Sequence, residues 1–140
     1  LENAEFVRYG VMHRNTFLDS PRLLDEWFML RGSDNVFFGG QMTGVEGYVE
    51  SAASGIIAGR ALADRLSGKQ PLTLPRTTML GALCSYISDP TVENFQPMAS
   101  SMGILPSLDR VIKGKQERYG ALAQRALSDL DKALSDSEDT

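Results

Sequence analysis

The chain is poor in the residues that most often reveal a chemistry: its 140 residues include one cysteine, one histidine and one tryptophan. A single cysteine, Cys84, excludes an internal disulfide framework and is typical of a protein from a reducing cytoplasm. No apolar run approaches the roughly 20 residues that a membrane-spanning helix needs, and no charged-then-apolar start resembles a secretory signal. We therefore predict a cytoplasmic protein with no membrane partner and no metal site.

An excess of basic residues is also lacking, since the formal net charge is −4. Residues 1–125, however, hold 13 Lys and Arg against 13 Asp and Glu, so the whole deficit lies in residues 126–140. We predict that this acidic tail is disordered. The neutral body leaves a nucleic-acid partner open.

Strand signals dominate the first 38 residues. Residues 5–12 are rich in aromatic and β-branched types, and residues 23–30 form an apolar stretch typical of a strand or a short helix. A turn signal at residues 31–35 separates that stretch from residues 36–38, a continuous apolar run typical of a strand buried on both faces. The pattern predicts a hairpin that ends in a buried strand.

A glycine-rich turn follows at residues 40–48 and leads into a predicted helix over residues 49–66. Small residues along this helix predict a face for close packing, and Ser67 with Gly68 predicts its end. After an extended link, Thr77 or Thr78 can cap a further helix that Pro90 stops.

Residues 94–108 are predicted to be a loop. From about residue 108 to residue 134 a last helical pattern runs, with a possible interruption at Gly114. Residues 109–125 are locally basic, which suits either contact with RNA phosphates or an ordinary solvated helix face.

The glycine turn has the properties of an anion-facing site. Glycines let the backbone approach a ligand closely, and the helix that follows offers unpaired N–H donors and a partial positive charge. The spacing Gly40, Gly44, Gly47 matches neither a Walker loop nor the G-x-G-x-x-G dinucleotide fingerprint. Spacing alone therefore leaves a structural turn as an equal alternative.

Four blocks of the sequence, in order, resemble the folate- and FAD-dependent tRNA (uracil-5-)-methyltransferases, the TrmFO family. The chief block is Gly-Gln-Met-Thr-Gly-Val-Glu-Gly-Tyr-Val-Glu-Ser-Ala-Ala-Ser-Gly at residues 40–55. The others are Phe6-Val7-Arg8-Tyr9-Gly10 with Met12-His13-Arg14-Asn15-Thr16, Thr77-Thr78 with Gly81-Ala82-Leu83, and Phe95-Gln96-Pro97-Met98 with Pro106. The chain departs from the family at Ala99, where we expect an asparagine.

The resemblance implies an α/β fold, the terminal part of a two-dinucleotide-binding, glutathione-reductase-like flavoprotein: a hairpin, strand, glycine turn and helix, then carboxy-terminal helices. Residues 1–68 would be the last segment of the FAD-binding domain. Residues 69–108 would be a proline-containing link with one short helix and a loop, and residues 109–140 a carboxy-terminal helix with the acidic tail.

The resemblance also implies an enzyme that methylates a tRNA T-loop uridine at C5. Methylenetetrahydrofolate would be the carbon donor, FAD the cofactor and NAD(P)H the reductant, with tRNA and folate as partners. The family's nucleophile would lie upstream of Leu1, so we expect no catalytic residue in this segment and no activity from these 140 residues alone. The alternatives are a GidA-type flavoprotein that modifies the tRNA wobble uridine, and a non-catalytic RNA-binding module derived from such an enzyme.

For FAD, the resemblance implies contact with the whole glycine turn, with the Gln41 side chain on the ribityl or pyrophosphate region. Glu46, expected in the first helical turn, can serve as a general acid or base or, more simply, as a capping group. The implied cofactor-binding residues are Gly40, Gln41, Met42, Thr43, Gly44, Val45, Glu46, Gly47 and Tyr48.

A polar cluster near the amino terminus is the candidate site for folate or RNA. His13 can stack on a pterin, and the arginines can meet carboxylates or phosphates, although solvated surface charge is the simpler reading for Arg8 and Arg14. The cluster consists of Arg8, His13, Arg14 and Asn15. Cys84 could in principle attack a uracil, but its place on an apolar helix face favours an inert core residue.

Overall fold

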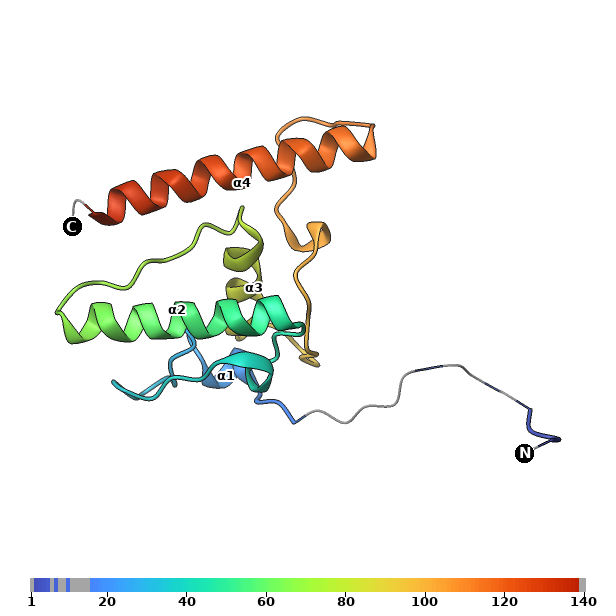
Figure 1. Ribbon diagram of the computed structural model, residues 1–140, viewed down its shortest axis with the longest axis horizontal. Coiled ribbons are helices and arrows are strands. Elements are labelled where there is room, and N and C mark those ends of the chain that lie inside the picture. Colours follow the sequence, from blue (N-terminus) through green and yellow to red (C-terminus); the bar gives the residue numbers. More distant parts are fainter. Residues whose placement is uncertain (1, 6, 8–9, 11–15, 139–140) are drawn as a thin grey trace.

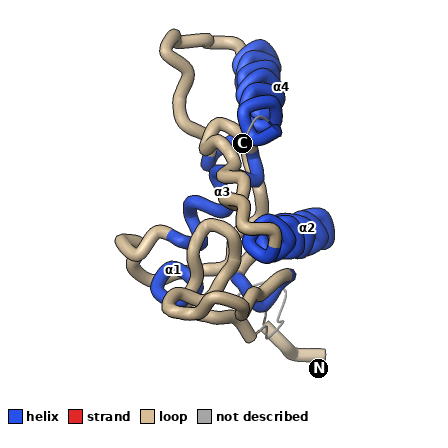
Figure 2. The backbone as a smooth tube through the Cα atoms, turned by 90° about the vertical axis from the view of Figure 1, so that its left-hand side faces the viewer, coloured by secondary structure: helices blue, strands red, loops and turns tan. Residues whose placement is uncertain are grey.

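Helices joined by irregular segments make up the chain, which a computed structural model describes at residues 2–5, 7, 10 and 16–138. Figures 1 and 2 show α4 on one side, α2 with α1 on the other, and α3 between them. The helices within these residues are α1 Ser20–Leu23, the 3-10 turn η1 Gly40–Thr43, α2 Tyr48–Leu66, α3 Met79–Ser88, the 3-10 turn η2 Met102–Ile104 and α4 Lys115–Glu138.

The predicted hairpin is present as a pair of short antiparallel contacts. Leu30 N donates to Val36 O at 2.8 Å, and Phe38 N donates to Phe28 O at 2.9 Å, around the turn at residues 31–35. Of residues 23–30, Leu23 ends α1, and residues 24–30 form neither a strand nor a helix. They make a tight loop in which Leu24 bridges Leu30, closed by the Asp25 carboxylate.

The prediction that residues 36–38 are buried on both faces is wrong, because Val36 is 40% exposed and Phe37 and Phe38 are half-buried. A strand is buried on both faces only where other elements pack against each side of its sheet. Among the described residues, Phe37 forms a single bridge, to Met29. The strand prediction for residues 5–12 falls largely outside the described residues.

The helix predicted at residues 49–66 is confirmed as α2. It ends at Ser67 and Gly68, whose φ of 72° is the left-handed conformation expected there. Its buried side is narrower than the sequence suggested: Ser54, Ala58 and Ala61 are buried, whereas Ile56 is 72% exposed. At 100° per residue, position 56 lies almost opposite the buried stripe.

Helix α3 is the centre of the core. Thr78 caps it by accepting a hydrogen bond from Gly81 N at 3.0 Å, and the helix ends at Ser88, two residues before Pro90, as predicted. It carries buried apolar side chains on the face predicted from their spacing. Together with residues from the hairpin, the glycine turn, α2 and the segment after α3 they form one cluster: Phe28, Val45, Ala58, Leu83, Cys84, Ile87 and Phe95.

The last helix differs from its prediction at both ends. Helix α4 begins only at Lys115, and Gly114 is the residue before it, whose carbonyl accepts from Arg118 N at 2.8 Å. Glycine is unfavourable inside a helix but suits its boundary. The helix then continues to Glu138, so the predicted disorder of the acidic tail is wrong for residues 126–138.

Apolar spacing explains why the tail is helical. Leu130 and Leu134 recur one turn apart and line an apolar pocket of about 280 Å³ shared with α2 and with residues 72–80. Both leucines are half-buried there, and this partial burial of an apolar face favours a helix despite the acidic composition. No helix among the described residues is long and apolar enough to cross a membrane. The α/β class stays a prediction, since a mostly helical segment is compatible with the end of such a fold.

Substituting Gly81 tests the packing of α3. An added Cβ would lie 2.1 Å from Pro75 O, which cannot move freely because it accepts hydrogen bonds from Thr78 N and Thr78 Oγ1. We expect Gly81→Ala to lower the free energy of unfolding by about 1–3 kcal/mol. Gly59→Ala in α2 is the control, because no atom lies within 4 Å of its added Cβ. It should be neutral or stabilising by up to about 1 kcal/mol. Equal effects of the two changes in chemical denaturation would contradict this packing.

Candidate functional site in the glycine-rich turn

The glycine turn is shaped by three residues in the left-handed region. Gly40, Gly44 and Gly47 have φ values of 73°, 84° and 115°. A non-glycine residue is strained at such angles. Between the first two, residues 40–43 form η1, and Gly47 is the residue from which α2 starts. The three glycines therefore fix the path of the backbone into the helix.

Three hydroxyl groups hold the glycine turn in place. Ser54 Oγ, buried on α2, accepts from Gly40 N at 2.7 Å. Thr43 Oγ1 donates to Gly40 O at 2.8 Å, and Thr43 O accepts from Ser20 Oγ at 2.8 Å. Because Thr43 is fully buried, its side chain maintains the turn and is not open to a ligand.

The turn packs directly on the block of the resemblance at residues 95–98. A Cβ on Gly44 would lie 2.4 Å from the Phe95 ring, so the ring occupies the space a side chain would need. Gly44 O accepts from Met98 N at 2.9 Å, and Met98 O accepts from Glu46 N at 3.0 Å. The structure thus brings the blocks at residues 40–55 and 95–98 together into one unit.

The carboxylate in the first turn of α2 is Glu50, and the placement of Glu46 there is wrong. Glu46 precedes Gly47, the residue before the helix. Glu50 Oε1 accepts from Ser100 N at 3.1 Å and from Ser100 Oγ at 2.6 Å. The hydrogen bond from the Ser100 hydroxyl and that from the backbone N–H of Glu50 lower the pKa of this carboxyl below its usual 4.5.

Glu50 was missed because its partner lies 50 residues away, although a signal was present. It stands three residues after the residue that starts the helix, the position from which a glutamate reaches back to the helix start. The carboxylate does so here: a Cβ on Gly47 would lie 2.2 Å from Glu50 Oε2. Gly47 is thus required by its φ, and the Glu50 carboxylate lies in the space beside it.

The nine predicted cofactor residues separate into an inner and an outer group. Thr43, Gly44 and Val45 are buried and belong to the support of the turn. The outer group could meet a ligand: Gly40, Gln41, Met42, Glu46, Gly47 and Tyr48 are exposed or half-buried. Tyr48 is 98% exposed, at the start of α2.

Two further predictions concern the candidate folate or RNA residues and Cys84. The candidate folate or RNA residues Arg8, His13, Arg14 and Asn15 lie outside the described residues. Cys84 is confirmed as a core residue: it is buried, and desolvation, with a smaller contribution from Glu26, raises its pKa to about 12. A thiol with that pKa is almost entirely protonated at neutral pH and is a poor nucleophile.

Substitution of Glu50 should produce a pH-dependent loss of stability. A carboxyl whose pKa is lowered in the folded state stabilises the fold above its unfolded pKa, and the contribution disappears as the pH falls through the folded value. Glu50→Gln should therefore reduce the free energy of unfolding at pH 7 by about 1 kcal/mol, since solvent screens a half-buried group.

The difference between wild type and Glu50→Gln should shrink as the pH falls below about 4.5. Denaturant unfolding from pH 7 to pH 3 measures it. Glu93→Gln, at an exposed position, is the control and should show no such trend. A difference that is constant with pH would mean that the charge of Glu50 contributes nothing.

Comparison with known proteins agrees with the blocks identified in the sequence. The profile of the family described as glucose inhibited division protein A matches residues 1–70. The methylenetetrahydrofolate–tRNA-(uracil-5-)-methyltransferase TrmFO of Streptococcus agalactiae is 56% identical over 136 residues, which is 96% of this chain and 31% of the relative. Proteins of the same name from Staphylococcus epidermidis and Staphylococcus carnosus are 57% and 54% identical over 94% of this chain and 30% of theirs.

The chain thus spans about 30% of the length of these relatives. The resemblance to TrmFO proteins inferred from four short blocks is confirmed over nearly the whole chain. The profile match covers half of the sequence, including the glycine turn and α2. The chain therefore belongs to the glucose inhibited division protein A family.

Proposed function

We propose that this chain is part of a flavoenzyme that methylates a tRNA T-loop uridine at C5. Methylenetetrahydrofolate is the carbon donor in this proposal and NAD(P)H the reductant. The observation that carries it is the identity of 54–57% with relatives named methylenetetrahydrofolate–tRNA-(uracil-5-)-methyltransferases. Because the chain covers under a third of those relatives, the activity belongs to a longer protein in this proposal.

The outer side of the glycine turn fits one wall of an FAD site. Gln41 offers an exposed amide, and Gly40 beside it leaves the backbone without a side chain where a ligand would approach. The N–H groups of Tyr48 and Val49 begin α2 and so have no partner within the helix. These donors and the helix dipole suit the negative charge of reduced flavin near N1 and O2.

When bound, FAD supplies the redox chemistry of the carbon transfer. The residues of this chain bind and orient it. Gln41 hydrogen-bonds the ribityl or pyrophosphate region, and the amides at the start of α2 face the pyrimidine end of the ring. Thr43 and Ser54 hold the turn rigid, and Glu50 ties the residues around Ser100 to it.

Removing the Gln41 amide should lower flavin content without loosening the fold. In the full-length protein, Gln41→Ala should reduce the visible flavin absorbance per mole of protein and the rate of methylation of an unmodified tRNA transcript. Gln41 is exposed, so the unfolding midpoint should not change. Gln70→Ala, at another exposed glutamine, is the matched control.

Gly44→Val adds a positive control for damage to the turn. It should lose both flavin and stability, since it meets the Phe95 ring at a left-handed φ. Normal flavin content in Gln41→Ala would mean that the Gln41 side chain does not bind the cofactor and that the turn is structural. A wild-type protein without flavin and without folate-dependent methylation would overturn the proposed function.

We propose that Arg8, His13, Arg14 and Asn15 bind folate or RNA, from their chemistry in the sequence. His13→Ala should raise the concentration of methylenetetrahydrofolate needed for half-maximal methylation while flavin content stays unchanged. Asn3→Ala provides a nearby exposed control. An unaltered folate requirement would make His13 a structural residue.

The family profile also leaves a GidA-type activity on the tRNA wobble uridine as the second candidate. The product separates the two: nucleoside analysis of treated tRNA distinguishes a methyl group on a T-loop uracil from a modified wobble uridine. The names of the relatives favour the first.

A further inference from the structure

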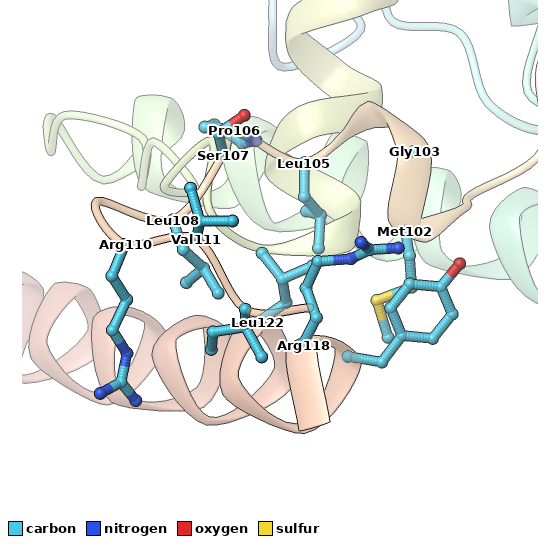
Figure 3. Close-up of a pocket in the computed structure, with 12 residues that line it drawn as sticks. Met102, Gly103, Leu105, Pro106, Ser107, Leu108, Arg110, Val111, Arg118 and Leu122 are labelled. Carbon is cyan, nitrogen blue, oxygen red and sulfur yellow. The ribbon is translucent and has the colours of Figure 1, made fainter. Parts of the chain in front are cut away.

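A pocket at the start of α4 combines cations, an aromatic ring and apolar walls. It has a volume of about 400 Å³ and lies between residues 102–112 and the first two turns of the helix. In Figure 3, Arg110 stands on one side and Arg118 on the other, with Val111 and Leu122 between them. A cavity of this size is within the range of small-molecule sites.

The cations around this pocket are not neutralised by carboxylates in the part of the chain that the structure describes. Arg110, Lys113, Lys115 and Arg118 are exposed, and within the described residues no ion pair joins any of them to a carboxylate. Other arginines differ in this respect. Three of them form ion pairs: Arg22 with Asp19, Arg60 with Asp64, and Arg65 with Asp34.

Arg125 does not belong to this set, although the sequence placed it in the same basic stretch. Its guanidinium donates to the carbonyl oxygens of Ser107 at 2.8 Å and Pro106 at 2.5 Å. It therefore fastens residues 106 and 107, which line the pocket, to α4. The cations that remain for a ligand are the four exposed ones, Arg110, Lys113, Lys115 and Arg118.

An aromatic ring stands among the free cations. The Lys115 Nζ and Arg118 Cζ atoms lie 5.6 Å and 5.7 Å from the centre of the Tyr119 ring. Val111, on the facing loop, is 93% exposed and adds apolar surface. Cations beside an aromatic ring and an apolar wall are the groups that bind unstacked bases and their phosphates in RNA.

We propose that this pocket binds an unstacked nucleotide of the tRNA substrate. The base packs against the Tyr119 ring and the apolar lining of the pocket, and Lys115, Arg118 and Arg110 contact the adjoining phosphates. The dipole of α4 adds positive potential at the same end. The proposal rests on the proposed function for tRNA as the ligand, and it assigns a binding surface separate from the glycine turn.

Binding of an unmodified, fluorescently labelled tRNA transcript to the full-length protein tests the phosphate contacts. Lys115→Gln with Arg118→Gln should flatten the slope of log affinity against log salt by roughly 1.5, since each lost phosphate contact contributes about 0.7–0.9. Lys69→Gln with Lys132→Gln removes the same charge from exposed positions elsewhere and should leave the slope near that of the wild type. Equal slopes for the two double variants would overturn the proposal.

Tyr119 tests the base contact separately. Tyr119→Leu should weaken tRNA binding roughly 5- to 150-fold, the range for one stacked base, with little change in the salt slope. Tyr119→Phe keeps the ring and should bind as the wild type does. If the leucine variant binds normally while its circular dichroism is unchanged, the ring contacts no base and the proposal fails.

Two further measurements separate this proposal from its rivals. Polyglutamate of matched charge should compete poorly with tRNA, and equal competition would assign the surface to an acidic protein instead. Flavin content and methylation by the wild type are measured in parallel. Charge-dependent tRNA binding without flavin would retain this surface and reject the proposed function. If instead the enzyme contains flavin and is active, but its tRNA affinity is unchanged by the Lys115 and Arg118 substitutions, the proposed function is retained and this binding surface is rejected.

Discussion

The contact on which the rest of the site depends is that between Gly44 and the ring of Phe95. The ring occupies the place of a Cβ on Gly44, and on its other sides it lies near Phe17 and Tyr86, with ring centroids 6.0 Å and 5.5 Å away. It therefore connects the buried cluster around α3 to the glycine turn. The turn's left-handed backbone is held by this packing and by the hydrogen bonds of residue 98, so the start of α2 has a fixed direction.

The glycine turn has buried residues that fix its backbone and exposed residues that contribute little to the fold. Beneath it, buried side chains and hydroxyl groups fix the backbone, as Thr43 and Ser54 do. Above it, exposed groups such as Gln41 and Tyr48 contribute little to the fold. That division is what a binding surface requires, because outer residues can serve a ligand only if inner ones keep the geometry without it. The carboxylate of Glu50 belongs to the inner kind, since Ser100 and the helix start satisfy it.

Local patterns predicted the helices well and the tertiary pairings poorly. The end of α2 at Ser67, the Thr78 cap and the burial of Cys84 each follow from residues within one helical turn, so the sequence contains the whole signal. The Glu50–Ser100 pair joins residues 50 positions apart, and no periodicity encodes that. The burial of residues 36–38 depends on neighbouring strands that a short apolar run cannot specify. The prediction of a disordered acidic tail was wrong for another reason. It rested on composition, whereas leucines one turn apart give α4 an apolar face.

Arg125 illustrates a different property of the molecule. Because one guanidinium holds two successive carbonyl groups, residues 106 and 107 are fixed to the side of α4 before any ligand arrives. If the proposed site binds a nucleotide, the ligand would not have to order this part of the loop. The conformational entropy lost on binding would then come mainly from the long, exposed lysine and arginine side chains.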